Sequence, residues 1–77
     1  MSSHFHSHCR TKCPQFVVDN IDSIEAICKT CRISYASVAR ATGIATSHIR
    51  EYAIYGVIPR KSNYNKLATF FDWEAWI

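Results

Sequence analysis

The sequence predicts an all-α fold, one compact domain of four to five short helices. Apolar residues recur at steps of three and four along most of the chain, and residues typical of helix ends stand between these runs. No stretch gives a convincing strand pattern. With 77 residues, the chain has room for one small core and for no second catalytic or sensory domain.

We expect the domain to span residues 21–77 and residues 1–20 to form an N-terminal tail or arm. Pro14 interrupts the tail, and the apolar residues 16–18 have the composition of an extended segment able to pair with a partner chain. The cations of the tail are compatible with an arm that follows a DNA groove and equally with disorder.

The first helix is predicted to begin at Asp22 and to end near Cys31. Asp22 is a favourable N-cap, and Glu25 stands three residues later, at the spacing of a capping box. Ile24 and Ile27 then supply a buried stripe.

A second helix is predicted over residues 35–42. Ser34 is its N-cap, and Gly43 closes it because glycine tolerates a left-handed backbone. The third helix is expected to begin near Ala45 or Thr46. It is predicted to bury Ile49, Tyr52 and Ala53 and to end at Gly56 and Pro59.

A fourth helix is expected after Pro59, with Ser62 or Asn63 as its cap. Its apolar face has the spacing i, i+3, i+4, i+7 and consists of Tyr64, Leu67, Ala68 and Phe71. The last residues, "DWEAWI", are expected to form a further turn of helix.

The second and third helices, joined at "TGIA", have the layout of a helix-turn-helix. Ala39 is small enough for the two helices to approach closely, and Ile49 pins the second of them to the core. The first turn of that helix, which is polar, can then enter the major groove of DNA.

With this layout, the chain resembles the lambda repressor and Cro family of helix-turn-helix domains. "ISYASVARATG" (33–43) matches the family's second helix, Ile49 sits where a central isoleucine belongs, and "YNKLATFF" (64–71) matches the fourth helix. Cys28 and Ala53 replace an arginine–glutamate pair that many members carry, which exchanges a buried ion pair for a small apolar contact. "GIATSHIREYAIYGVIP" also resembles MerR-type regulators, which leaves an excisionase-like protein as an alternative.

The resemblance implies which residues contact DNA bases. Hydroxyls can meet either base type, and a carboxylate can accept a hydrogen bond from cytosine N4. Arginine reaches guanine or phosphate, and the sequence leaves this choice open. The base-reading set implied for the third helix is Thr46, Ser47, Glu51, Arg50 and His48.

A second set is assigned to the phosphate backbone, which positions a protein without specifying sequence. Tyr35 matches a position that clamps the backbone in the family. The whole phosphate-binding set is Tyr35, Arg40, Arg60, Lys61 and Asn63.

The function that this resemblance implies is a sequence-specific transcriptional regulator of the Cro or repressor type, such as a phage encodes. It would bind double-stranded DNA as a homodimer at a pseudo-palindromic operator. So small a core cannot bury every apolar residue of the C-terminal end, so we expect a dimer interface at Phe70, Trp73, Trp76 and Ile77. The alternative from a different class is a helix-turn-helix module that binds a protein partner, as an antirepressor or antitoxin-like protein does.

The cysteines stand as Cys9-x3-Cys13 and Cys28-x2-Cys31, with His4, His6 and His8 upstream. Zinc and disulfides are both chemically possible. Free thiols are the favoured interpretation because the second pair lies within a helix and the cytoplasm is reducing. We therefore expect no metal and no cofactor.

The remaining classes are disfavoured. The chain has no catalytic Ser/His/Asp or Cys/His arrangement and no glycine-rich phosphate loop, so we do not expect an enzyme. It has no apolar run of the roughly 18 residues that span a bilayer and no secretory signal pattern, so we expect a cytoplasmic protein. The net charge of +3 is compatible with nucleic-acid binding.

Overall fold

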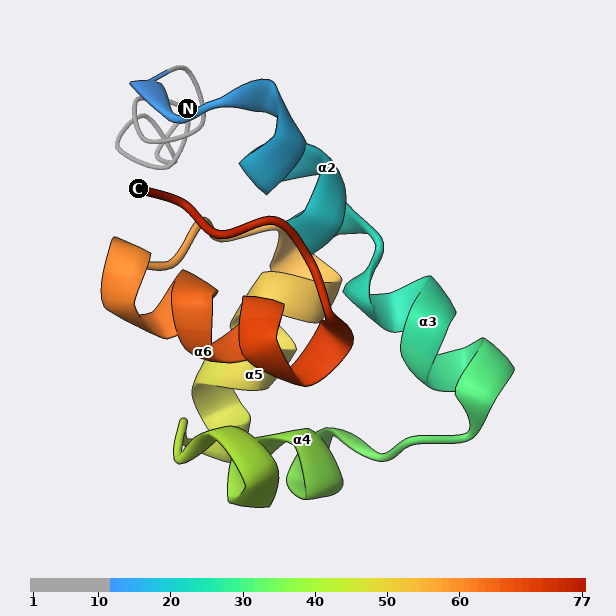
Figure 1. Cartoon of the computed structure of the whole chain (residues 1–77). Helices are drawn as coiled ribbons and strands as arrows, with labels where there is room; N and C mark the ends of the chain where they lie inside the picture. The colour runs from blue at the N-terminus through green and yellow to red at the C-terminus, as the bar shows by residue number, and fades with distance from the viewer. Residues whose placement is uncertain (1–11) are drawn as a thin grey trace.

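The computed structural model describes residues 12–77 as helices joined by short turns (Figure 1). In chain order these are α2 (Gln15–Asp22), α3 (Ile24–Cys31), α4 (Tyr35–Thr42), α5 (Thr46–Tyr55) and α6 (Lys61–Phe71). No strand occurs within residues 12–77, which confirms the all-α prediction. None of the helices described combines the length and the apolar character needed to cross a membrane.

Helix α5 is the centre of the packing, because it lies against α2, α3 and α4. Figure 1 shows it behind α6, with α2, α3 and α4 arranged around it. Each helix contributes at least one buried apolar side chain, so one continuous core joins all of them. Its largest fully buried members are Tyr64, Ile21, Ile24, Ile49, Leu67, Val17 and Val38.

The prediction for residues 15–20 was wrong, because these residues belong to helix α2. They were expected in the tail, with residues 16–18 extended and available to a partner chain, yet they form a helix of the packed domain. Val17 and Ile21 lie one turn apart and are fully buried. Pro14 precedes the helix as its N-cap residue, and its carbonyl accepts a hydrogen bond from the Val17 N–H at 3.1 Å. The proline therefore begins a helix here.

The start of α3 also differs from the prediction. Asp22 is the last residue of α2, so its backbone is helical and cannot take the extended conformation of an N-cap. Ser23 occupies that position, and no side chain caps the helix. Ile24 is buried as expected, whereas Ile27 is only partly buried and Cys28 is buried in its place.

The predicted ends of α4 and α5 are confirmed. The Ser34 hydroxyl accepts a hydrogen bond from the Ser37 N–H at 3.1 Å and so caps α4. Gly43 ends α4 with φ +78° and Gly56 ends α5 with φ +69°, both in the left-handed region.

Helix α6 begins at Lys61, slightly earlier than predicted, and ends at Phe71, because Asp72 follows with a left-handed φ of +61°. Residues 73–77 are not helical, so the further turn expected in "DWEAWI" is absent. Asn65 holds this segment against α6 through hydrogen bonds to the backbone of Trp76, and these replace the hydrogen bonds that a helix would supply.

Candidate nucleic-acid interface

The turn between α4 and α5 is fixed by hydrogen bonds of its own residues. The Gly43 N–H donates to the Ala39 carbonyl at 2.8 Å. The Thr42 hydroxyl donates to the Val38 carbonyl at 2.7 Å and accepts from the Ile44 N–H at 3.3 Å. Because Ile44 is also buried, the chain enters α5 from a defined position, and the direction of α5 relative to α4 is set.

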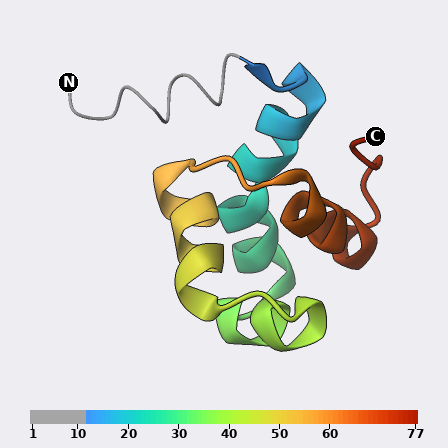
Figure 2. The same ribbon diagram turned by 90° about the vertical axis from the view of Figure 1, so that its left-hand side faces the viewer.

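Helix α5 has one buried face and one exposed face. Ile49 is fully buried and Tyr52 and Ala53 nearly so, as predicted. In Figure 2 the helix, drawn in yellow, runs along the left-hand edge of the molecule with no other helix outside it. Every residue predicted to read bases is exposed on α5: Thr46, Ser47, His48, Arg50 and Glu51.

Beside α5 lies a groove whose other wall is the segment before α6 together with the first turn of α6. His48 and Glu51 line it from α5, and Arg60, Ser62 and Asn63 line it from the opposite side. The structure therefore brings together side chains that the sequence analysis had assigned separately to bases and to phosphates.

Tyr52 organises one wall of this groove. Its ring stacks with the His48 imidazole at a centroid separation of 6.5 Å and an interplanar angle of 24°. Its hydroxyl accepts a hydrogen bond from the Asn63 amide at 3.2 Å. The predicted phosphate ligand Asn63 is thus already engaged by Tyr52, and the His48 ring packs against the same side chain.

Lys61 lies apart from the groove. Its ammonium donates to the Ile77 carbonyl at 3.0 Å and stands 5.6 Å from the centre of the Trp76 ring. The structure therefore separates two cations that are adjacent in the sequence: Arg60 lines the groove, and Lys61 contacts the C-terminal segment.

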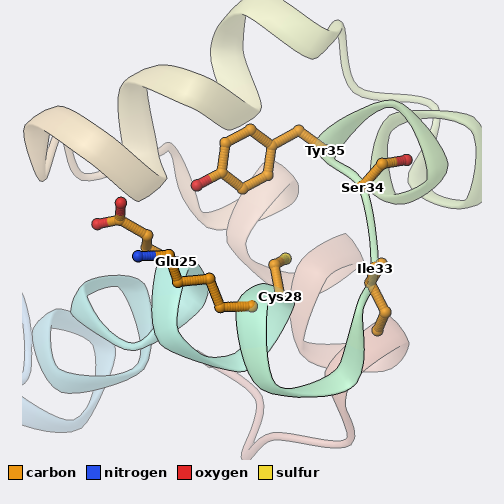
Figure 3. Close-up of a pocket in the computed structure, with 6 residues that line it drawn as sticks. Glu25, Cys28, Ile33, Ser34 and Tyr35 are labelled. Carbon is orange, nitrogen blue, oxygen red and sulfur yellow. The ribbon is translucent and has the colours of Figure 1, made fainter.

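Tyr35 lies in a second groove, between α3 and the start of α4 (Figure 3). Its side chain is partly buried, and in Figure 3 its hydroxyl points toward Glu25. Burial raises the pKa of Tyr35, the Glu25 carboxylate adds to this, and the Arg50 guanidinium opposes it. The net effect is a raised pKa, because burial and Glu25 outweigh the Arg50 guanidinium.

Arg40 is exposed on α4 and donates to the Ser37 hydroxyl at 3.4 Å. It borders a shallow depression over the turn, where Ala36, Ala39 and Ala45 leave the surface low. Small side chains here leave room for another molecule to approach the turn.

The predicted dimer residues are mostly packed against their own chain. Phe70, Trp73 and Trp76 are partly buried against the core, and only Ile77 is almost fully exposed, at 96%. Sequence reasoning missed two other exposed apolar residues, Ile54 and Tyr55, at the end of α5. Their exposure could have been predicted from the sequence, because both residues lie on the polar side of the predicted helix.

The thiols Cys28 and Cys31 are free, the first buried and the second exposed. Within residues 12–77, no group of three histidine, cysteine or acidic side chains lies close enough to hold a metal ion. His4, His6, His8 and Cys9 lie outside the described residues. The segment between α5 and α6 contains no strand.

Comparisons with protein-family models, with curated proteins and with solved structures return no match.

Proposed function

We propose that this protein is a sequence-specific DNA-binding transcriptional regulator of the Cro or repressor type. It binds a pseudo-palindromic operator as a homodimer and inserts α5 into the major groove. The observation that carries the proposal is the division of α5: Ile49 anchors one face in the core, while Thr46 and Ser47 project from the exposed first turn.

The chemistry of the exposed face of α5 fits direct readout of bases. The hydroxyls of Thr46 and Ser47 serve as donors or acceptors, and the Glu51 carboxylate accepts from the amino group of cytosine. Glu51 follows Ser47 by four residues, so both lie on one stripe of the helix. The three side chains together can contact neighbouring base pairs.

Two cations fit contacts to phosphates. Arg50 is exposed on α5, and Arg60 lines the groove beside this helix. Phosphate contacts from these two side chains would hold α5 in register along the major groove of the DNA. A regulator of this kind must be in the same compartment as the DNA that it binds. We therefore propose a cytoplasmic location, as for a phage-type regulator.

A footprint of the DNA that flanks the protein's own gene tests the proposal. The purified protein should protect a roughly palindromic site across a salt series and in the presence of random competitor DNA. Ser47→Ala should weaken protection, whereas Thr69→Ala, which removes an exposed hydroxyl from α6, should leave it intact. Weak binding that is indifferent to sequence and lost at physiological salt would overturn the proposal.

A second candidate function is a module that binds a protein partner. The observation in its favour is the exposed pair Ile54 and Tyr55, 42% and 76% accessible, at the end of α5. Exposed apolar side chains that lie next to one another can form a contact surface, whereas isolated ones are ordinary. A stable heterocomplex that is lost on Tyr55→Ser, together with the absence of a footprint, would favour this candidate.

A further inference from the structure

Ile54 lies in the middle of the exposed face of α5. It follows Ser47 by seven residues, so the two side chains leave the helix within about 20° of each other, two turns apart. The buried side chains Ile49, Tyr52 and Ala53 occupy the opposite side of the helix. Ile54 is 42% exposed in this position. An apolar side chain therefore stands on the face to which the proposed function assigns base readout.

The nearest neighbours of Ile54 on this face are polar. Arg50 precedes it by four residues and Glu51 by three, the spacings at which side chains of a helix lie side by side, and both are exposed. The Ile54 side chain leans toward these two residues, because side chains of a helix point back toward its amino end. Ile54 therefore continues the row of exposed side chains that begins in the first turn of α5.

The length of this row fits inside a major groove. From Ser47 to Ile54 the helix extends about 10 Å. The major groove of B-DNA is about 12 Å wide and about 8.5 Å deep. Figure 2 shows no other helix outside α5, so its exposed face is open to a large partner. A duplex that Ser47 contacts therefore also lies within reach of Ile54.

The major groove offers one kind of apolar group to such a side chain. Its base edges present hydrogen-bond donors and acceptors and, on thymine alone, a 5-methyl group. An aliphatic side chain makes no hydrogen bond, and it gains free energy when it leaves water to contact another apolar group. The thymine methyl group is therefore the feature of the groove that the Ile54 side chain complements.

From this placement we propose that Ile54 is a specificity-determining residue that contacts the 5-methyl group of a thymine in the operator. The inference rests on the proposed DNA-binding function and deepens it, because it adds an apolar contact to the hydrogen bonds of Thr46, Ser47 and Glu51. It also differs from the second candidate function, in which Ile54 contacts a protein.

The experiment replaces the thymines of the operator by deoxyuridine, one position at a time and in both half-sites. Each replacement removes a methyl group and leaves base pairing intact. At one position, the wild-type chain should bind the deoxyuridine operator about fourfold more weakly per half-site, the effect of one lost methyl contact. Ile54→Ala should bind the thymine and deoxyuridine operators equally at that position.

Three further variants make the assignment specific to Ile54. Ile54→Val keeps a branched apolar side chain and should retain most of the methyl effect. Thr46→Ser removes the other methyl group of this face that can meet thymine, and it should leave the effect at the Ile54 position unchanged. Thr69→Ala, on the exposed side of α6, should keep both the affinity and the methyl effect of the wild type. Circular dichroism shows that each variant remains helical.

Two results would overturn the inference while the proposed function stands: specific binding that no deoxyuridine replacement weakens, or the same methyl effect in Ile54→Ala as in the wild type. An unchanged methyl effect together with a protein complex that is lost in Ile54→Ala would assign this side chain to the second candidate function. Failure to find a specific site in any DNA would instead remove the proposed function, and the inference with it.

Discussion

Asn65 holds the backbone of Trp76 with both ends of its amide. The side-chain nitrogen donates to the Trp76 carbonyl at 2.9 Å, and the side-chain oxygen accepts from the Trp76 N–H at 2.7 Å. The Tyr64 hydroxyl donates to the Glu74 carbonyl at 2.9 Å, and the Tyr64 ring stacks with Trp73. Residues 73–77 are thus folded back onto α6, where they cover Tyr64.

Asn65→Ala should release the C-terminal segment. The change removes two hydrogen bonds and leaves the peptide groups of Trp76 to water, so we expect a loss of about 1–3 kcal/mol in the free energy of unfolding. Urea denaturation measures the loss, and tryptophan emission should shift to longer wavelength in the folded state. Thr69→Ala is the control, because the Thr69 hydroxyl bonds only within α6. Equal stability and equal emission of the two variants would contradict the role of Asn65.

Gly43→Ala should destabilise the domain through the backbone alone. Gly43 has φ +78°, and a Cβ atom built there meets nothing within 4 Å, so the cost is that of a left-handed L-residue, about 1 kcal/mol. Gly43→Asn should cost less, because asparagine adopts this conformation more readily. Thermal or urea unfolding of both variants tests the order. An alanine variant as stable as the wild type would show that the turn adopts another conformation.

Cys28 should make the stability fall at alkaline pH. Burial, with a smaller contribution from Cys31, raises the pKa of the Cys28 thiol. The folded state therefore keeps a proton that the unfolded state releases above the ordinary thiol pKa of about 8.5. The stabilisation is complete below that pH and is lost as the pH rises toward the folded pKa. Urea denaturation from pH 7.5 to 9.5 should show this decline in the wild type and a smaller one in Cys28→Ala; equal declines would contradict it.

Glu51→Ala and Arg60→Ala should alter DNA binding in different ways. Loss of Glu51 should relax the base preference at one position, at about 1–3 kcal/mol of discrimination, with less effect on overall affinity. Loss of Arg60 should weaken binding to all sequences alike and reduce the salt slope by about 1. Binding to a library of operator variants over a salt series measures both quantities. Lys66→Ala removes an exposed cation of α6 outside the groove and serves as the charge control. Equal effects of the first two variants on every sequence would contradict these roles.

The sequence predicted α4 and α5 well because their signals are local. The signals are a hydroxyl at Ser34, a glycine at the left-handed end of each of these two helices and apolar residues one turn apart. All of them depend on neighbours within four residues. The same locality explains why α2 was missed. Val17 and Val18 favour extended structure when considered alone. The four-residue spacing of Val17 and Ile21 favours a helix only when both side chains are buried in the core.

The candidate site was predicted as a set of exposed residues, and each of the five on α5 is exposed. Their grouping was not predictable. Arg60 and Lys61 are adjacent in the chain, yet one lines the groove with His48 and the other contacts Trp76 and Ile77. Successive residues at the start of a helix point about 100° apart, so neighbours in sequence reach different surroundings.

By itself, the sequence determined an all-α chain, the lengths of α4 and α5, and the face of α5 that is buried, because hydrophobic period and end residues act over one turn of helix. The tertiary structure decided the helix at residues 15–22, the course of residues 73–77 and the position of His48 and Arg60 along one groove. These depend on partners far apart in the chain, as in the hydrogen bond from Asn20 to the Tyr64 hydroxyl at 2.9 Å. Such contacts form only when the free energy of packing offsets the conformational entropy lost in bringing distant segments together.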